Sequence, residues 1–189
     1  MGGIFVRTIL LLFGLTLALT LVLKYLVAPR YGEDVAERFL ERLKYIPSQT
    51  EVLSKATLAR WLADSPHARA ISGYVFPVLF PLDVLFLICL GLFLALASAS
   101  LAERLGFLSA VPAWIWWIIP ASYMASDLAE DAGLVATLKS WIRLTPTSFR
   151  LLSILTSLKL ATVTLAIGQF AFLGALNLLL LIFPPSPPV

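Results

Sequence analysis

Four long apolar stretches constrain the fold of this chain more than any other feature of its sequence. A transmembrane helix needs about 20 predominantly apolar residues, and each stretch is at least that long. Inside a bilayer the backbone polar groups must be satisfied within the segment, which a helix achieves. The sequence therefore predicts an all-α polytopic membrane protein, a single domain over residues 1–189 with spans at about 4–26, 72–99, 107–132 and 149–183.

Composition supports the membrane class. The chain is 60% hydrophobic and 13% charged, with a mean hydropathy of +0.93, whereas soluble domains are about 45–50% apolar and about 25% charged. The net charge is only +3, and the basic residues are scattered among acids, which argues against a nucleic-acid partner. Cys89 and His67 are single residues of their kinds, so no intrachain disulfide and no Cys/His metal pattern is expected.

The topology follows from the ends of the apolar stretches. We expect the first stretch to stay as an uncleaved signal anchor. A cleaved signal peptide is the competing interpretation, but the apolar region is long and Leu26-Val27-Ala28 is a weak cleavage site. A short turn near residues 102–104 makes spans two and three antiparallel neighbours, which predicts a four-helix bundle.

The 28–71 segment between spans one and two is the only sizeable polar part of the chain. Apolar residues recur at helical spacing from Val35 to Ile46, and Pro47 ends that pattern. A capping box, Ser48-Gln49-Thr50-Glu51, then opens a second short helix. We expect an amphipathic helical cap lying on the membrane surface or on the end of the bundle, with a partner-binding module as the alternative.

Ionisable residues interrupt the apolar stretches, which is costly inside a bilayer and calls for a partner or a function. Because spans alternate in direction, the start of span two, the end of span three and the start of span four share one membrane face. At about 1.5 Å per residue, Asp83 and Lys159 lie roughly 16 and 13 Å from that face. Asp127, Glu130 and Asp131 close span three on the same side. The sequence thus predicts a polar chamber in one leaflet, beneath the cap.

Helical spacing defines a candidate binding site within this chamber. Positions i, i+3 and i+4 share a helix face, so span three presents one stripe of polar side chains, and span four adds Ser157 beside its lysine. The predicted site consists of Asp83, Tyr123, Asp127, Glu130, Asp131, Ser157 and Lys159. Carboxylates this close repel one another unless a cation, a proton or the lysine neutralises them. A divalent cation at Asp127, Glu130 and Asp131 is the candidate cofactor.

Each charged residue also has a simpler interpretation. Glu130 and Asp131 could be solvated at the membrane boundary. Asp83 could form a structural ion pair with Lys159, or the lysine could snorkel to the interface on its long stem. Deeper in span four, Gln169 and Asn177 are expected to be interhelical hydrogen-bonding residues rather than ligands.

Three short motifs resemble a family of uncharacterised four-span bacterial integral membrane proteins. They are Pro-Leu-Asp-Val-Leu-Phe around Asp83, Asp-Leu-Ala-Glu-Asp from Asp127, and Thr-Ser-Leu-Lys ending at Lys159. The match covers about residues 45–160, and it departs from the family pattern at Asp131, where Asn is expected. The resemblance implies the four-span topology and a bacterial cytoplasmic membrane, and it carries no established activity.

Orientation rests on the basic residues. Arg7 at the short N-terminus indicates that this end is cytoplasmic, whereas the loops of the opposite face hold most of the lysine and arginine. Long loops translocate with less regard to charge, and the 28–71 segment is long and nearly charge-balanced. We therefore expect the N-terminus inside.

Three functions are compatible with the sequence. The first is a binding or scaffold protein whose polar site holds a cation, a lipid headgroup or a partner segment, with membrane lipids and a protein partner or a second copy as partners. The second is an intramembrane enzyme that uses a metal or acid–base pair on a lipid-linked substrate. The third is an ion-coupled transporter component, which four spans without a repeat would build by oligomerisation.

Overall fold

The computed structural model describes residues 2–31, 59, 62–63, 68–108 and 110–183. This part of the chain is built from helices and the turns that join them, with no strand among the described residues. The all-α class is therefore confirmed. Most of the predicted cap at 28–71 lies outside the described residues.

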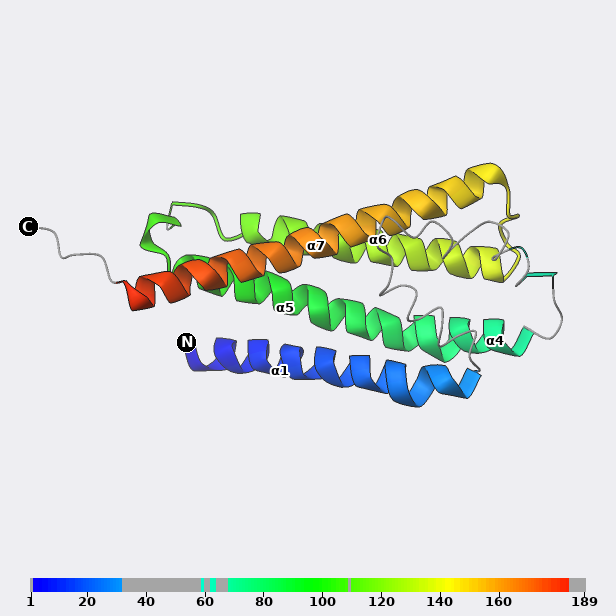
Figure 1. Ribbon diagram of the computed structural model, residues 1–189, viewed down its shortest axis with the longest axis horizontal. Helices are drawn as coiled ribbons and strands as arrows, with labels where there is room; N and C mark the ends of the chain where they lie inside the picture. Colours follow the sequence, from blue (N-terminus) through cyan, green and yellow to red (C-terminus); the bar gives the residue numbers. More distant parts are fainter. Residues whose placement is uncertain (1, 32–58, 60–61, 64–67, 109, 184–189) are drawn as a thin grey trace, which may run out of the picture.

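In the described part of the chain, four long helices lie side by side along the longest axis of the molecule (Figure 1). They are α1 (Gly2–Leu21), α5 (Val84–Glu103), α6 (Ile115–Leu138) and α7 (Pro146–Ile182). The shorter elements are η1 (Val22–Val27), η2 (Ala28–Tyr31), α4 (Ala68–Gly73), η4 (Tyr74–Asp83) and η5 (Gly106–Leu108). Helix α5 packs against each of the other three long helices, and α7 packs most extensively against α6.

The ends of the long helices fall into two groups. The start of α1, the end of α7 and the α5–α6 connection lie at one end of the molecule, and the α6–α7 connection lies at the other (Figure 1). Long helices that follow one another along the chain therefore run in opposite directions.

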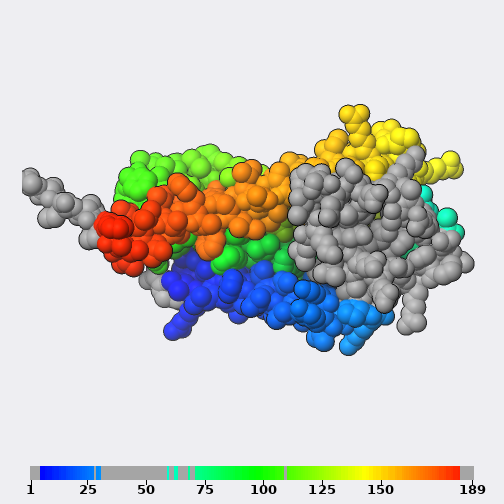
Figure 2. Space-filling model, in the orientation of Figure 1, coloured from blue at the N-terminus to red at the C-terminus, as the bar shows by residue number. Residues whose placement is uncertain are grey.

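Among the described residues, three segments are long and apolar enough to cross a membrane: Phe5–Val27, Ile71–Glu103 and Pro146–Ile182. Large apolar side chains on the outer faces of α1 and α7 are exposed, for example Leu10, Leu11 and Leu181. Both helices form much of the surface in Figure 2. Apolar surface on this scale is typical of contact with a membrane, and the chain is accordingly a helical integral membrane protein.

Helix α6 differs in its bounds from the predicted third span at 107–132. It begins at Ile115, after a 3-10 turn at Gly106–Leu108, and ends at Leu138. Pro112 lacks a backbone N–H and lies in the irregular stretch before the helix. Because Leu134 and Leu138 are buried in the core, the helix continues past the acidic residues. The acids thus lie inside α6, which continues seven residues beyond Asp131, and the bounds of the third membrane span stay a prediction.

Prolines bend the second span next to the site. Pro77 and Pro81 lie in η4, and the residue before each, Phe76 and Phe80, has an extended backbone (φ −141°, ψ 118° and φ −127°, ψ 126°). This follows from the steric effect of a proline ring on the preceding residue. Regular helix resumes at Val84, immediately after Asp83. Asp83 therefore lies between the bend and the start of α5.

Two amide side chains join α7 to the end of α5 and the start of α6. Asn177 Nδ2 donates to the Leu101 carbonyl, and Gln169 Nε2 donates to the Trp116 carbonyl, each at 2.9 Å. Both bonds connect different helices, so the prediction of interhelical hydrogen bonds is confirmed. The site at the opposite end of these helices is held by a different set of contacts.

Candidate functional site

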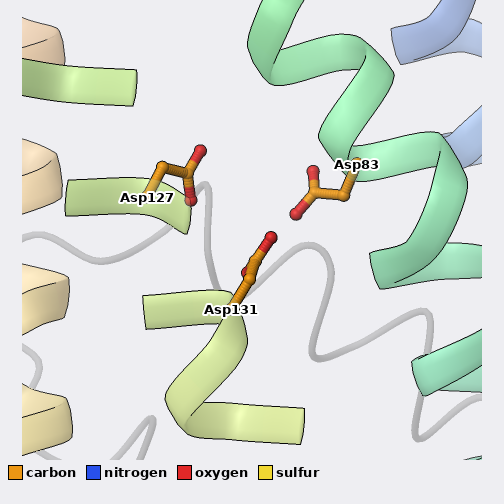
Figure 3. A group of neighbouring side chains, drawn as sticks. All are labelled: Asp83, Asp127 and Asp131. Atoms are coloured by element: carbon orange, nitrogen blue, oxygen red, sulfur yellow. The ribbon is translucent and has the colours of Figure 1, made fainter. Parts of the chain in front are cut away.

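Three buried aspartates converge between α6 and the start of α5 (Figure 3). One carboxylate oxygen from each of Asp83, Asp127 and Asp131 lies within 4.8 Å of the other two. Their side chains are only 7%, 2% and 4% exposed. We refer to these residues as the aspartate triad.

The geometry of α6 explains which acids join the triad. An α-helix turns about 100° per residue, so Asp131 lies about 40° from Asp127 around the axis. Glu130 precedes Asp131 and is rotated about 100° away from it. Asp127 and Asp131 therefore point toward Asp83, whereas Glu130 points toward α7.

Lys159 of α7 neutralises two acidic side chains of α6, Asp127 and Glu130. Its Nζ forms an ion pair with Asp127 and a second one with Glu130 Oε2 at 2.9 Å. Thr156 Oγ1 donates to Glu130 Oε1 at 2.6 Å. Hydrogen bonds to ionised groups are about twice as strong as neutral ones, so these contacts fix Glu130 and hold α6 against α7.

Two further polar contacts surround the triad. Tyr123, one turn before Asp127, is 2% exposed, and its side chain hydrogen-bonds Asp127. Ser126 and Thr162 form a buried hydroxyl–hydroxyl hydrogen bond of 3.2 Å between α6 and α7. Buried hydroxyls are expected to find partners of this kind. The contacts leave α6 tightly positioned relative to its neighbours.

A cavity of about 280 Å³ adjoins the triad. Asp83, Asp127, Tyr123 and Lys159 contribute its polar side chains, together with Thr20 of α1. The other described residues of the wall are apolar and come from η1, α5 and α7: Leu23, Phe86, Leu90, Leu160, Val163 and Ile167. The described lining is thus charged at one end and hydrocarbon elsewhere.

Six of the seven predicted site residues lie together: Asp83, Tyr123, Asp127, Glu130, Asp131 and Lys159. Ser157 does not join them, because it is exposed and donates to the carbonyl of Ser153 at 2.9 Å. Thr156 takes the place expected for Ser157. The spacing in the sequence indicates Thr156, since it lies three residues before Lys159 and shares its helix face.

Several simpler interpretations are corrected by the structure. Glu130 and Asp131 are 1% and 4% exposed, so a solvated boundary position is wrong for both. Lys159 does not extend away to an interface, because Asp127 and Glu130 bind its ammonium. The group with metal-ligand spacing contains Asp83 in place of the predicted Glu130. The reason is rotational: Glu130 faces α7, and the bend in η4 supplies the third carboxylate from the other side.

The spacing of the triad's carboxylate oxygens determines whether they can bind one metal ion. Hard divalent cations bind oxygen ligands at about 2.0–2.6 Å, so two oxygens on one ion lie at most about 5 Å apart. The triad oxygens meet that limit. These three residues can therefore provide ligands to one divalent cation.

The fold and the site define a helical integral membrane protein with a buried aspartate triad and a lysine ion-pair network. No protein-family model, curated protein or solved structure matches the chain. The resemblance to uncharacterised four-span bacterial membrane proteins therefore stays a prediction.

Proposed function

We propose that this protein is a four-span membrane protein that binds a divalent cation at Asp83, Asp127 and Asp131, within one leaflet of the bilayer. The convergence of three buried carboxylates from two helices is the observation that carries this proposal. Carboxylates are the ligands that hard divalent cations prefer. A buried group of acids is also costly to maintain without a role.

The fourth span in this proposal is α6. It has 24 residues, roughly 36 Å of helix, which is enough for a hydrocarbon core of about 30 Å. Its acids face the bundle interior rather than lipid, since all three are buried. The ion pairs to Lys159 lower the cost of placing Asp127 and Glu130 there.

Metal-dependent stabilisation tests the proposed function. A ligand that binds only the folded protein stabilises it by about 2.7 kcal/mol at a hundred times its Kd. We expect Mn²⁺ or Ca²⁺ to raise the unfolding temperature of the detergent-solubilised protein. Asp131→Asn should abolish that increase, because it removes one ligand while preserving the shape of the side chain.

Glu103→Gln is the matched control, since Glu103 is an exposed acid at the other end of α5. It should keep the full metal-dependent increase. Equal increases for the wild type and for Asp131→Asn would place the metal elsewhere and contradict the proposal.

A further inference from the structure

The cavity beside the triad is strongly asymmetric. Charged side chains lie at one end, where Asp83, Asp127 and Lys159 approach it. From Lys159 to Ile167 along α7 the lining extends eight residues, or roughly 12 Å, and it is apolar beyond the lysine. A ligand that fills it needs a polar head and a narrow apolar body.

The volume sets the size of that body. At about 30 Å³ per water-sized group, 280 Å³ holds roughly nine such groups. This is near the lower limit of the roughly 300–1,000 Å³ typical of small-molecule sites. This volume matches one hydrocarbon chain of medium length, and the two chains of a phospholipid exceed it.

The charged side chains at the cavity determine which polar head group binds there. Asp83 and Asp127 bring two carboxylates to the cavity, and Asp131 lies against both. Among the described residues of this wall, Lys159 is the cation, and it pairs with Asp127 and Glu130, so carboxylates outnumber ammonium groups there. Tyr123 adds a hydroxyl that hydrogen-bonds Asp127. An ammonium head complements this acidic end, because it carries positive charge and several hydrogen-bond donors.

We propose that the cavity binds a single-chain amphiphile with an amine head, its ammonium group at Asp83 and Asp127 and its chain along α5 and α7. This rests on the proposed function in one respect, since the ammonium would use carboxylates that also bind the metal. The amine and the divalent cation should therefore compete.

Photolabelling tests where the chain binds. The probe is decylamine with a diazirine on its chain, added to the protein in phosphatidylcholine nanodiscs and mapped by peptide mass spectrometry. We expect labels on the cavity wall, at Phe86, Leu90, Val163 or Ile167. Excess decylamine should suppress them, and decanol, which lacks the charge, should do so at least about tenfold less effectively.

A pair of tryptophan substitutions on α7 supplies the matched control. Val163→Trp fills the cavity and should reduce labelling of its wall by about tenfold or more. Leu165→Trp lies two residues further along, at an exposed position, and should leave the labelling unchanged. Should Val163→Trp fail to fold, the competition in the wild-type protein still decides the question.

Failure of this inference differs from failure of the metal site. Mn²⁺ binding without displacement by decylamine, together with labels spread evenly over the lipid-facing residues, would overturn the inference and leave the metal site standing. Cavity labelling without any Mn²⁺ binding would reject the metal site and keep the amphiphile. If decanol suppressed the labels as strongly as decylamine does, the proposal that the ligand has an amine head would be contradicted.

Discussion

Glu130 and Asp131 are consecutive in the chain, yet their side chains contact different helices. Glu130 binds Lys159 and Thr156 of α7, and Asp131 joins Asp83 at the start of α5. The difference follows from the rotation of about 100° between neighbouring residues of a helix. One acidic motif therefore supplies both an ion-pair network and part of a candidate metal site.

Lys159 should contribute strongly to stability. Replacing it with methionine keeps the apolar stem but leaves Asp127 and Glu130 buried without its ammonium. Removing one partner of a buried pair typically costs about 3–5 kcal/mol. We expect Lys159→Met to lower the free energy of unfolding by about that amount, measured by SDS titration in mixed micelles.

Lys139→Met is the comparison for that measurement, since Lys139 is exposed just after α6. Its effect should lie within about 0.5 kcal/mol. Similar unfolding curves for the two variants would show that the ion pairs do not stabilise the fold.

Thr156 and its neighbour Ser157 form a second matched pair. Thr156→Val removes the hydrogen bond to Glu130 with little change of shape, and leaving a buried acceptor without its donor costs about 1–3 kcal/mol. Ser157→Ala removes only a bond to the backbone of its own helix and should cost less than about 0.5 kcal/mol. The same SDS titration measures both, and a larger loss for Ser157→Ala would reverse the assignment.

At the scale of helices, the packing of α5 on α6 depends on one glycine. A Cβ added at Gly91 would collide with Cγ and Sδ of Met124, in the middle of that side chain. Overpacking of this kind costs about 1–3 kcal/mol. Gly91→Ala should therefore destabilise the protein, and the added Met124→Ala substitution should recover part of the loss in unfolding experiments.

Gly168→Ala tests the same chemical change where no atom lies within 4 Å of the new Cβ. Because alanine favours a helix over glycine by roughly 0.5–1 kcal/mol, this variant should be equally or more stable. If Gly91→Ala behaved in the same way, the close approach of α5 and α6 would be contradicted.

Depth in the bundle was predictable from the sequence, whereas rotation about each helix axis was only partly so. The rise per residue and the alternating direction of spans were enough to place Asp83, Asp127 and Lys159 at one level. Which neighbour each side chain meets depends on how the helices pack, so the sequence alone predicts Ser157 at the site, whereas Thr156 binds Glu130 there. The position of Asp83 also depends on the backbone bends at Phe76 and Phe80, which the two prolines indicated without giving a direction.

At the scale of the whole molecule, the proposed four-span topology requires α6 to cross the bilayer. Glu103 and Lys139 flank this helix, and both are exposed. In a Cys89→Ala background, Glu103→Cys and Lys139→Cys should react with a membrane-impermeant maleimide from opposite sides of sealed vesicles. Labelling of both cysteines from one side, before permeabilisation, would show that α6 does not span the membrane.

Metal binding at the aspartate triad is measured by counting bound Mn²⁺ with electron paramagnetic resonance. The wild-type protein and Glu103→Gln should each bind one ion per chain, because the control acid lies far from the triad along α5. Asp83→Asn should bind none at the same concentration while keeping its helical circular dichroism spectrum. A folded Asp83→Asn protein that still binds one Mn²⁺ per chain would contradict the account.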